Sequence, residues 1–174
     1  GFAEVVLGSQ SILHATESRS ADYTLPEAPA RRYAVHEAKQ RLHQAVFREN
    51  VLRAYGNRCA ISGLPIKRLL DAAHITPDSE DDTSTEVSNG ISLSRLHHQA
   101  LDANLLGISP DLRVVVSQRV LETRDGSLLA ALQGCHETKI HIPKTKLLQP
   151  ETERLARRFE LFEQAQSLSH STNC

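Results

Sequence analysis

Methionine and tryptophan are absent from this 174-residue chain, and cysteine is scarce. A translated chain starts with methionine, whereas residue 1 is glycine, so we expect the sequence to be the C-terminal part of a larger protein or a piece cut from one. The three cysteines, Cys59, Cys135 and Cys174, are odd in number and widely spaced. This spacing argues against a disulfide framework and favours a reducing, cytoplasmic location. No apolar run approaches the length of a bilayer span, so we expect no membrane partner.

Net charge is also low, at a formal -1, but its distribution is uneven. Nine basic residues lie between Arg31 and Arg68, and only Glu37 and Glu49 oppose them. The segment 78–86 then carries five acids and no base. A phosphate backbone would be attracted to the first segment and repelled by the second. Charge alone is explained better by a solvated helix face followed by a solvated acidic loop.

Two prolines in LPEAPA predict a boundary near Ala30. We therefore expect three parts: an N-terminal arm or linker at 1–30, which could be the tail of a missing upstream domain, a folded domain at 31–168, and a short tail at 169–174.

Apolar periodicity and turn residues predict an α+β domain with flanking helices and a small additional β-hairpin. Helices are expected at 36–55, at 94–105 with Gly107 closing it, and from Pro150 onward, where three apolar residues share one face. A hairpin is expected within 58–76, a polar loop at 77–90, and further strands at 113–117 and 139–143.

The segment between Cys59 and Asp102 carries residues suited to phosphodiester hydrolysis. An imidazole titrates near neutral pH and can act as a base, and His74 stands at the end of a predicted strand. His98 and Asp102 are four apart on a predicted helix, so they share a face and could bind one cation. Each feature also has a structural explanation, as a structural histidine or a His–Asp surface pair.

Two further residues of this segment have both a structural and a functional interpretation. Asn89 precedes Gly90, which is typical of a turn, but its amide could also pin a loop. Asp71 could help to hold a metal, or it could pair with Arg68 or Lys67.

Together these residues resemble the HNH endonuclease superfamily, whose core is a ββα-metal finger. The strings that carry the resemblance are RLHQAVFRENVLRAYGNRCAISG, LLDAAHITPD and NGISLSRLHHQALDANLLGISPD, which cover roughly residues 41–110. The interval of nine positions from Asn89 to His98 matches the family's spacing of asparagine and final histidine. The chain is most similar to bacterial predicted restriction endonucleases with a C-terminal HNH domain behind a variable DNA-reading domain.

The resemblance implies a role for each matched residue. His74 corresponds to the general base, Asn89 to the asparagine that fixes the loop, and His98 to a metal ligand. Asp102 corresponds to an acid common in this branch, and Asp71 is the other candidate carboxylate, because Ala73 stands where many relatives have a ligand. The implied cofactor is a divalent metal, Mg²⁺ or Mn²⁺ first, with Ni²⁺ or Zn²⁺ as alternatives.

Many relatives also clamp the finger with a structural zinc. The corresponding positions here are Cys59, Ser62, Ser94 and His97, and serine is a poor zinc ligand. We predict no structural zinc, and expect apolar packing to replace it, from Ile61, Leu69, Leu70, Ile75, Leu96 and Leu101.

The implied activity is metal-dependent cleavage of DNA, leaving 5′-phosphate and 3′-hydroxyl ends, as the nuclease domain of a restriction enzyme. A homodimer would allow both strands to be cut. The alternatives are an effector nuclease of a phage-defence or toxin system, a DNA-binding module without catalysis, and an interaction domain. Candidate phosphate contacts are basic residues of the first half, namely Arg41, Arg48, Arg53, Lys67, Arg68 and Arg95.

Overall fold

The computed structural model describes residues 28–76, 86–124 and 126–171. Residues 1–27 of the predicted N-terminal arm and residues 77–85 of the predicted polar loop lie outside these ranges. Five α-helices occur in the described part of the chain: α1 (Ala28–Ala54), α2 (Arg95–Asp102), α3 (Gln118–Glu122), α4 (Ser127–Gln133) and α5 (Thr152–Ser171). Its strands are β1 (Leu70–His74), β2 (Gly90–Ser94), β3 (Leu106–Ile108) and β4 (Val114–Val116). Short 3-10 helices are η1 (Lys67–Leu69), η2 (Val87–Asn89) and η3 (Lys146–Leu148).

The strands form two antiparallel pairs, β1 with β2 and β3 with β4. In the first pair Leu70 lies opposite Ser94, and His74 lies opposite Gly90. Helix α2 follows β2 directly, which completes a ββα unit, and β3–β4 is the predicted additional hairpin. The expected α+β class is confirmed.

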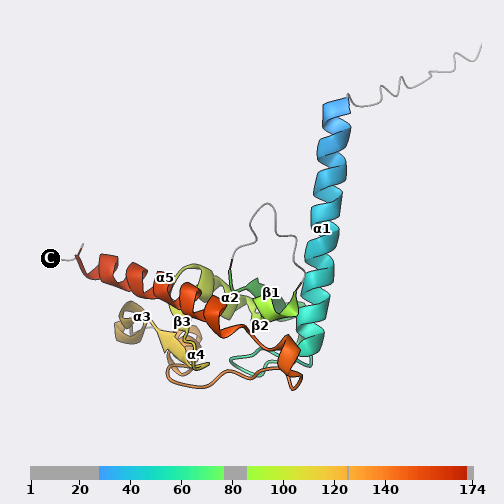
Figure 1. Cartoon of the computed structure of the whole chain (residues 1–174). Coiled ribbons are helices and arrows are strands. Elements are labelled where there is room, and N and C mark those ends of the chain that lie inside the picture. The colour runs from blue at the N-terminus through green and yellow to red at the C-terminus, as the bar shows by residue number, and fades with distance from the viewer. Residues whose placement is uncertain (1–27, 77–85, 125, 172–174) are drawn as a thin grey trace, which may run out of the picture.

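Helix α1 confirms the helix predicted at 36–55, but it begins earlier, at Ala28, so the predicted boundary near Ala30 falls in its first turn. The helix extends away from the rest of the structure, and only its C-terminal end lies against β1 and β2 (Figure 1). Phe47, Val51 and Leu52 are buried there, whereas residues 33–46 are exposed. The helix ends at Ala54, and Gly56 and Asn57, which follow it closely, both have positive φ and turn the chain away.

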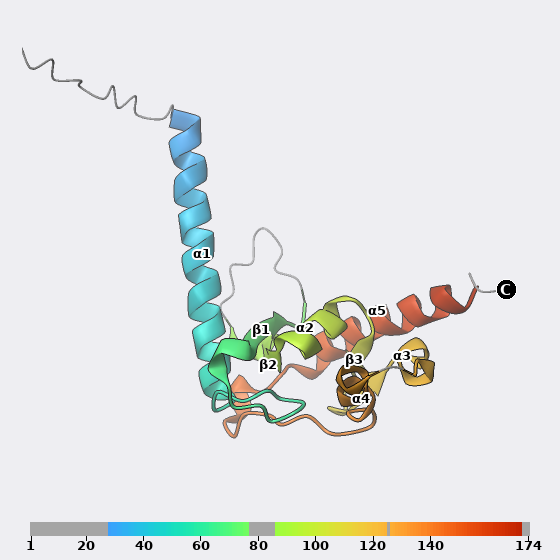
Figure 2. The ribbon, with the colours of Figure 1, turned by 180° about the vertical axis from the view of Figure 1, so that it is seen from behind.

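Helix α5 lies along the domain beside β3, and the view from behind shows its other end extending past the body (Figure 2). Leu155 and Phe162 are buried on its inner face, as the sequence predicts. A Cβ at Gly107 would lie only 2.7 Å from the Phe162 ring, so this strand residue has to be glycine for α5 to approach. Gly107 therefore lies within β3 and does not close α2.

Two strand predictions are wrong. Residues 58–61 are not a strand: Cys59 N donates to Leu64 O at 3.0 Å and Ala60 N donates to Ser92 O at 2.7 Å, which makes this segment a tight loop. The partner of β1 is β2, which lies between the loop predicted at 77–90 and the helix predicted at 94–105 and shares only an end residue with each. Residues 139–143 form only one isolated bridge, between Arg113 and Lys139, although Ile140 is buried.

The core is one cluster that joins α1, both hairpins, α2 and α5. Leu70, Ile75 and Leu101 are buried in it as predicted, and Ile61 and Leu96 pack against it. Leu69 is an exception, because 47% of it is exposed. The helix α2 is thereby fixed on the β1–β2 pair, and its outer face is positioned beside the end of β1.

Candidate active site

Helix α2 presents His98 and Asp102 beside the end of β1. Ser94 is its N-cap, and its side chain accepts a hydrogen bond from His97 N at 3.3 Å. Ala100 and Leu101 are buried toward the hairpin, so the opposite face carries the polar pair. His98 Nε2 lies 3.4 Å from Asp102 Oδ2, at the i, i+4 spacing that the sequence predicts.

His98 also has a carboxylate on its other side. Its Nδ1 lies 3.6 Å from Oδ2 of Asp71, and Oδ1 of Asp71 lies 3.4 Å from Arg48 Nε. Asp71 and Asp102 therefore contact opposite nitrogens of one imidazole. Within the described residues no group of three or more His, Cys, Asp or Glu side chains is placed to hold one ion.

His74 is half-buried at the last position of β1. Its ring stacks on Phe47 of α1, with centroids 4.0 Å apart and planes 6° from parallel. A Cβ at Gly90, opposite His74, would lie 2.8 Å from the Phe47 ring and 2.5 Å from Val51 Cγ2. Glycine at this register position thus lets α1 approach closely enough for its phenyl ring to stack on the imidazole.

Asn89 is 1% exposed and braces the chain two residues after His74. Its Oδ1 accepts from Thr76 N at 3.1 Å and from Thr76 Oγ1 at 3.0 Å, while its Nδ2 donates to Thr76 O at 3.2 Å. The backbone of Asn89 accepts from Ile75 N at 2.9 Å. The amide therefore bonds both sides of one peptide segment, which is the pinning role considered for it from the sequence.

His74, His98 and Asp102 line one pocket. A cavity of about 540 Å³ is lined by His74, Ile75, His98, Asp102, Asn104, Arg158 and Leu161. Two of the predicted functional elements, the imidazole of His74 and the His98–Asp102 pair, thus face the same space. Arg158 and Leu161 come from α5, and no spacing pattern in the sequence connects them to His74 or His98.

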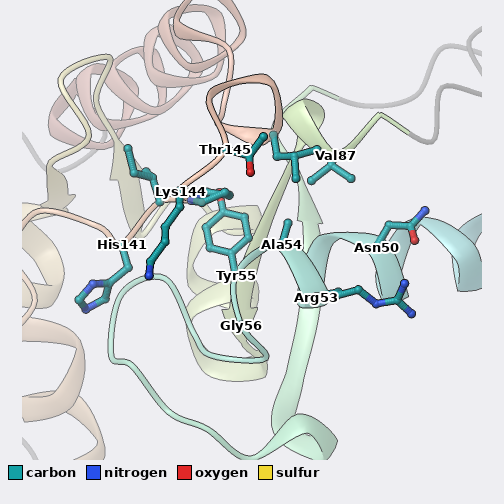
Figure 3. Close-up of a pocket in the computed structure, with 12 residues that line it drawn as sticks. Asn50, Arg53, Ala54, Tyr55, Gly56, Val87, His141, Lys144 and Thr145 are labelled. Carbon is teal, nitrogen blue, oxygen red and sulfur yellow. The ribbon is translucent and has the colours of Figure 1, made fainter.

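A second pocket, of about 620 Å³, lies elsewhere and contains none of the candidate catalytic residues. Figure 3 shows Tyr55, His141 and Lys144 around it, with Arg53 at another side. Of the predicted site residues only Arg53 lines it.

The predicted phosphate contacts are largely occupied by protein partners. Arg48 Nη2 donates to Leu70 O at 2.7 Å, in addition to its contact with Asp71, so it holds β1 to α1. Arg41 pairs with Glu37 at 3.1 Å. Arg53 and Lys67 both lie against Glu49, at 3.7 and 2.8 Å, and the Lys67 contact holds the pKa of Glu49 below its usual value. Arg68 and Arg95 are exposed.

Cys59 and His97 form a buried contact at the positions that bind zinc in many relatives. Cys59 Sγ lies 3.4 Å from His97 Nδ1 and accepts from the backbone N of Ser94 at 3.2 Å and of Ser62 at 3.5 Å. Burial opposes ionisation of both groups. The hydrogen bonds, led by that of His97, nevertheless lower the pKa of Cys59 to about 6. The thiols of Cys135 and Cys59 raise the pKa of His97 to about 9.

No helix in the described ranges combines the length and the hydrophobicity that a bilayer span requires. No curated protein matches the chain. Residues 59–109, which hold β1, β2, α2 and β3, match the family model described as HNH endonuclease. The matched segment includes His74, Asn89, His98 and Asp102, whereas Phe47 and Arg158 lie outside it. Over these residues the chain is therefore similar to the HNH endonuclease family.

Proposed function

We propose that this domain is a metal-dependent DNA endonuclease in which His74 activates water. The observation that supports this most directly is the shared pocket: the His74 imidazole and the His98–Asp102 pair line one cavity that is large enough for part of a nucleotide. Nuclease chemistry needs a base and a cation on the same phosphate, and this pocket offers groups for both.

His74 would accept a proton from water as the water oxygen attacks phosphorus. The Phe47 stack contacts the ring itself, and the Asn89 bonds to Thr76 hold the chain two residues after it. A base in fixed geometry keeps the attacking water in line with the leaving oxygen, which lowers the entropic part of the barrier.

His98 Nε2 and Asp102 would hold a divalent metal ion, Mg²⁺ or Mn²⁺, with Ni²⁺ or Zn²⁺ as alternatives. An imidazole nitrogen and a carboxylate are suitable donors, and Mg²⁺ commonly binds through one or two carboxylates together with substrate phosphate and water. When bound, the ion would stabilise negative charge on the phosphate and on the leaving 3′ oxygen. Asp71, on the Nδ1 side, would orient the His98 ring and thereby act as an outer partner.

The substrate would be DNA, and cleavage would leave 5′-phosphate and 3′-hydroxyl ends by analogy with the family. The nuclease domain of a restriction enzyme is the physiological context we propose, and the assay below compares modified with unmodified DNA. An effector nuclease of a defence system would use the same chemistry under different control.

The test is incubation of modified and unmodified supercoiled plasmid with the protein in Mg²⁺, Mn²⁺ or Ni²⁺, with EDTA as the control. We expect nicked or linear DNA in at least one metal and none in EDTA. Binding without cleavage under every condition would instead identify a DNA-binding module.

A further inference from the structure

Helix α5, which lies outside the segment matched to the family, contributes an arginine to the candidate pocket. Arg158 is half-buried. Its Nη1 donates to Asn104 Oδ1 at 2.7 Å, and its Nη2 donates to the carbonyl of Leu101. Both acceptors belong to the end of α2 or the turn that follows it, so the guanidinium is fixed beside the helix that carries His98.

Arg158 is the only Lys or Arg among the described residues that line this pocket. Burial lowers its pKa, and the Asp102 carboxylate opposes that shift. The group keeps its charge, because guanidinium does not deprotonate in proteins. The pocket thus holds a permanent positive charge near a carboxylate that is itself a proposed metal ligand.

The guanidinium has donors to spare beyond its two bonds. It carries five N–H groups in a planar fork, whose geometry matches the oxygens of a phosphate. Leu161, one helical turn further along α5, lines the same pocket and gives it an apolar wall. A phosphodiester with its sugar presents a charged group next to an apolar one, and this pair of side chains complements both.

We propose that Arg158 binds a non-bridging oxygen of the DNA phosphate in this pocket. This inference rests on the proposed function. The anionic phosphate would be held between Arg158 on α5 and the cation side at His98, while His74 reaches the attacking water. The guanidinium would stabilise the extra negative charge that develops on the phosphate oxygens during attack. Loss of Arg158 would therefore lower kcat more than it lowers the stability of the fold.

A structural role for Arg158 predicts different behaviour, since its two bonds also join α5 to the end of α2. Three variants separate the roles. Arg158→Ala removes the charge, and Arg158→Lys keeps the charge but loses the fork. Gln166→Ala removes another bond between α5 and the turn after α2, which Gln166 Nε2 donates to Asn104 O at 2.7 Å, and Gln166 does not line the pocket. Arg157→Ala, an exposed neighbour on the same helix, is the matched control.

The experiment measures kcat and KM for plasmid nicking, together with Tm, and repeats the Arg158→Ala assay with added guanidinium ion. We expect Arg158→Ala to lose about 10²–10³-fold in kcat, Arg158→Lys to lose less, and guanidinium to restore part of the Arg158→Ala rate without changing Tm. Gln166→Ala should lower Tm while it retains most of the activity, and Arg157→Ala should match the wild type.

Two outcomes would overturn the inference. In the first, the wild type cleaves through His74 but folded Arg158→Ala cleaves within about threefold of it. In the second, Arg158→Ala and Gln166→Ala lose activity and Tm in parallel, without rescue by guanidinium. If the wild type cleaves no DNA in any metal, the proposed function itself fails, and that result is distinct from both.

Discussion

Phe47 and His74 stack nearly parallel, with ring centroids 4.0 Å apart, although they lie on different elements and 27 positions apart in the chain. The phenyl ring belongs to α1, before the segment that matches the family. The orientation of the proposed base therefore depends on a helix outside the ββα unit, and on Gly90, which leaves the space for that helix.

Replacing Phe47 with leucine should separate positioning from stability. Leucine keeps the apolar contact with Val51 and Gly90 but loses the stack, so the free energy of unfolding should fall by less than about 1.5 kcal/mol. The cleavage rate should fall by about tenfold or more, because a small displacement of a reacting group is costly. Leu132→Val, a buried change in α4, should cost similar stability and leave the rate of the folded protein unchanged. Equal rates for the two variants would contradict the positioning role.

Asn89 supplies a second constraint on the same segment. Asn89→Ala removes three side-chain hydrogen bonds to Thr76 and leaves its N–H and C=O without these partners. We expect a loss of about 3 kcal/mol in the free energy of unfolding, because each unsatisfied buried group costs roughly 1–3 kcal/mol. Thr76→Ser keeps the hydroxyl and both backbone bonds, so it should stay within about 0.5 kcal/mol of the wild type. Urea unfolding measures both, and a neutral Asn89→Ala would show that the amide does not hold the loop.

The two carboxylates on either side of His98 should differ in their effect on metal binding. Asp102 is the proposed ligand, and Asp71 is the proposed outer partner. Asp71→Asn should weaken Mn²⁺ binding by about 10–100-fold, as outer partners typically do, and Asp102→Asn should weaken it further. Calorimetric titration of Mn²⁺ into the protein gives both affinities. Asp111→Asn, in the β3–β4 turn, is the control, and a larger loss in Asp71→Asn than in Asp102→Asn would reverse the assignment.

The Cys59–His97 contact predicts two opposing effects of pH on the free energy of unfolding. The lowered pKa of Cys59, taken alone, makes stability rise between about pH 6 and the usual thiol pKa, because the unfolded chain then holds a proton that the folded chain has released. The raised pKa of His97 makes stability fall from its usual pKa up to about 9. The two slopes have opposite signs and cancel, since the proton leaves the thiol and stays on the imidazole.

Compared with the wild type, His97→Gln should lose stability at alkaline pH. In this variant the buried Cys59 thiol would stay protonated, whereas in the unfolded chain it ionises near pH 8.5. The free energy of unfolding should therefore fall by about 1.4 kcal/mol per pH unit above that point. Urea unfolding from pH 6.5 to 9.5 measures the difference between the two proteins. Parallel curves would show that Cys59 and His97 do not exchange a proton.

The sequence predicted the α2 pair well and the strands less well. His98 and Asp102 could be placed together because helical spacing alone puts i and i+4 on one face. Strand β2 alternates in sequence from Ile91 to Ser94, but the run is short, lies between the turn residues Asn89-Gly90 and the helix cap at Ser94, and has both faces buried, so the pattern did not identify it. Residues 139–143 alternate like a strand, but packing of Ile140 and Ile142 explains the pattern without a second strand beside them.

Contributions from distant elements could not be predicted. Phe47 looked like any apolar residue of a helix, and nothing about its spacing connected it to His74. Arg158 lies in an ordinary charged helix, and tertiary contacts such as the packing of Phe162 over Gly107 bring that helix to the pocket. Arg48 was expected to contact phosphate, whereas its hydrogen bond to Leu70 O and its contact with Asp71 show a role within the fold.

The role of His74 as the base is tested most directly by the rate at which His74→Ala cleaves DNA in saturating Mg²⁺ or Mn²⁺. His43→Ala, an exposed histidine of α1, is the matched control. We expect a rate about 10²–10⁴-fold below the wild type, with DNA binding retained and the control unchanged. Cleavage by folded His74→Ala at the wild-type rate would show that His74 is not the base.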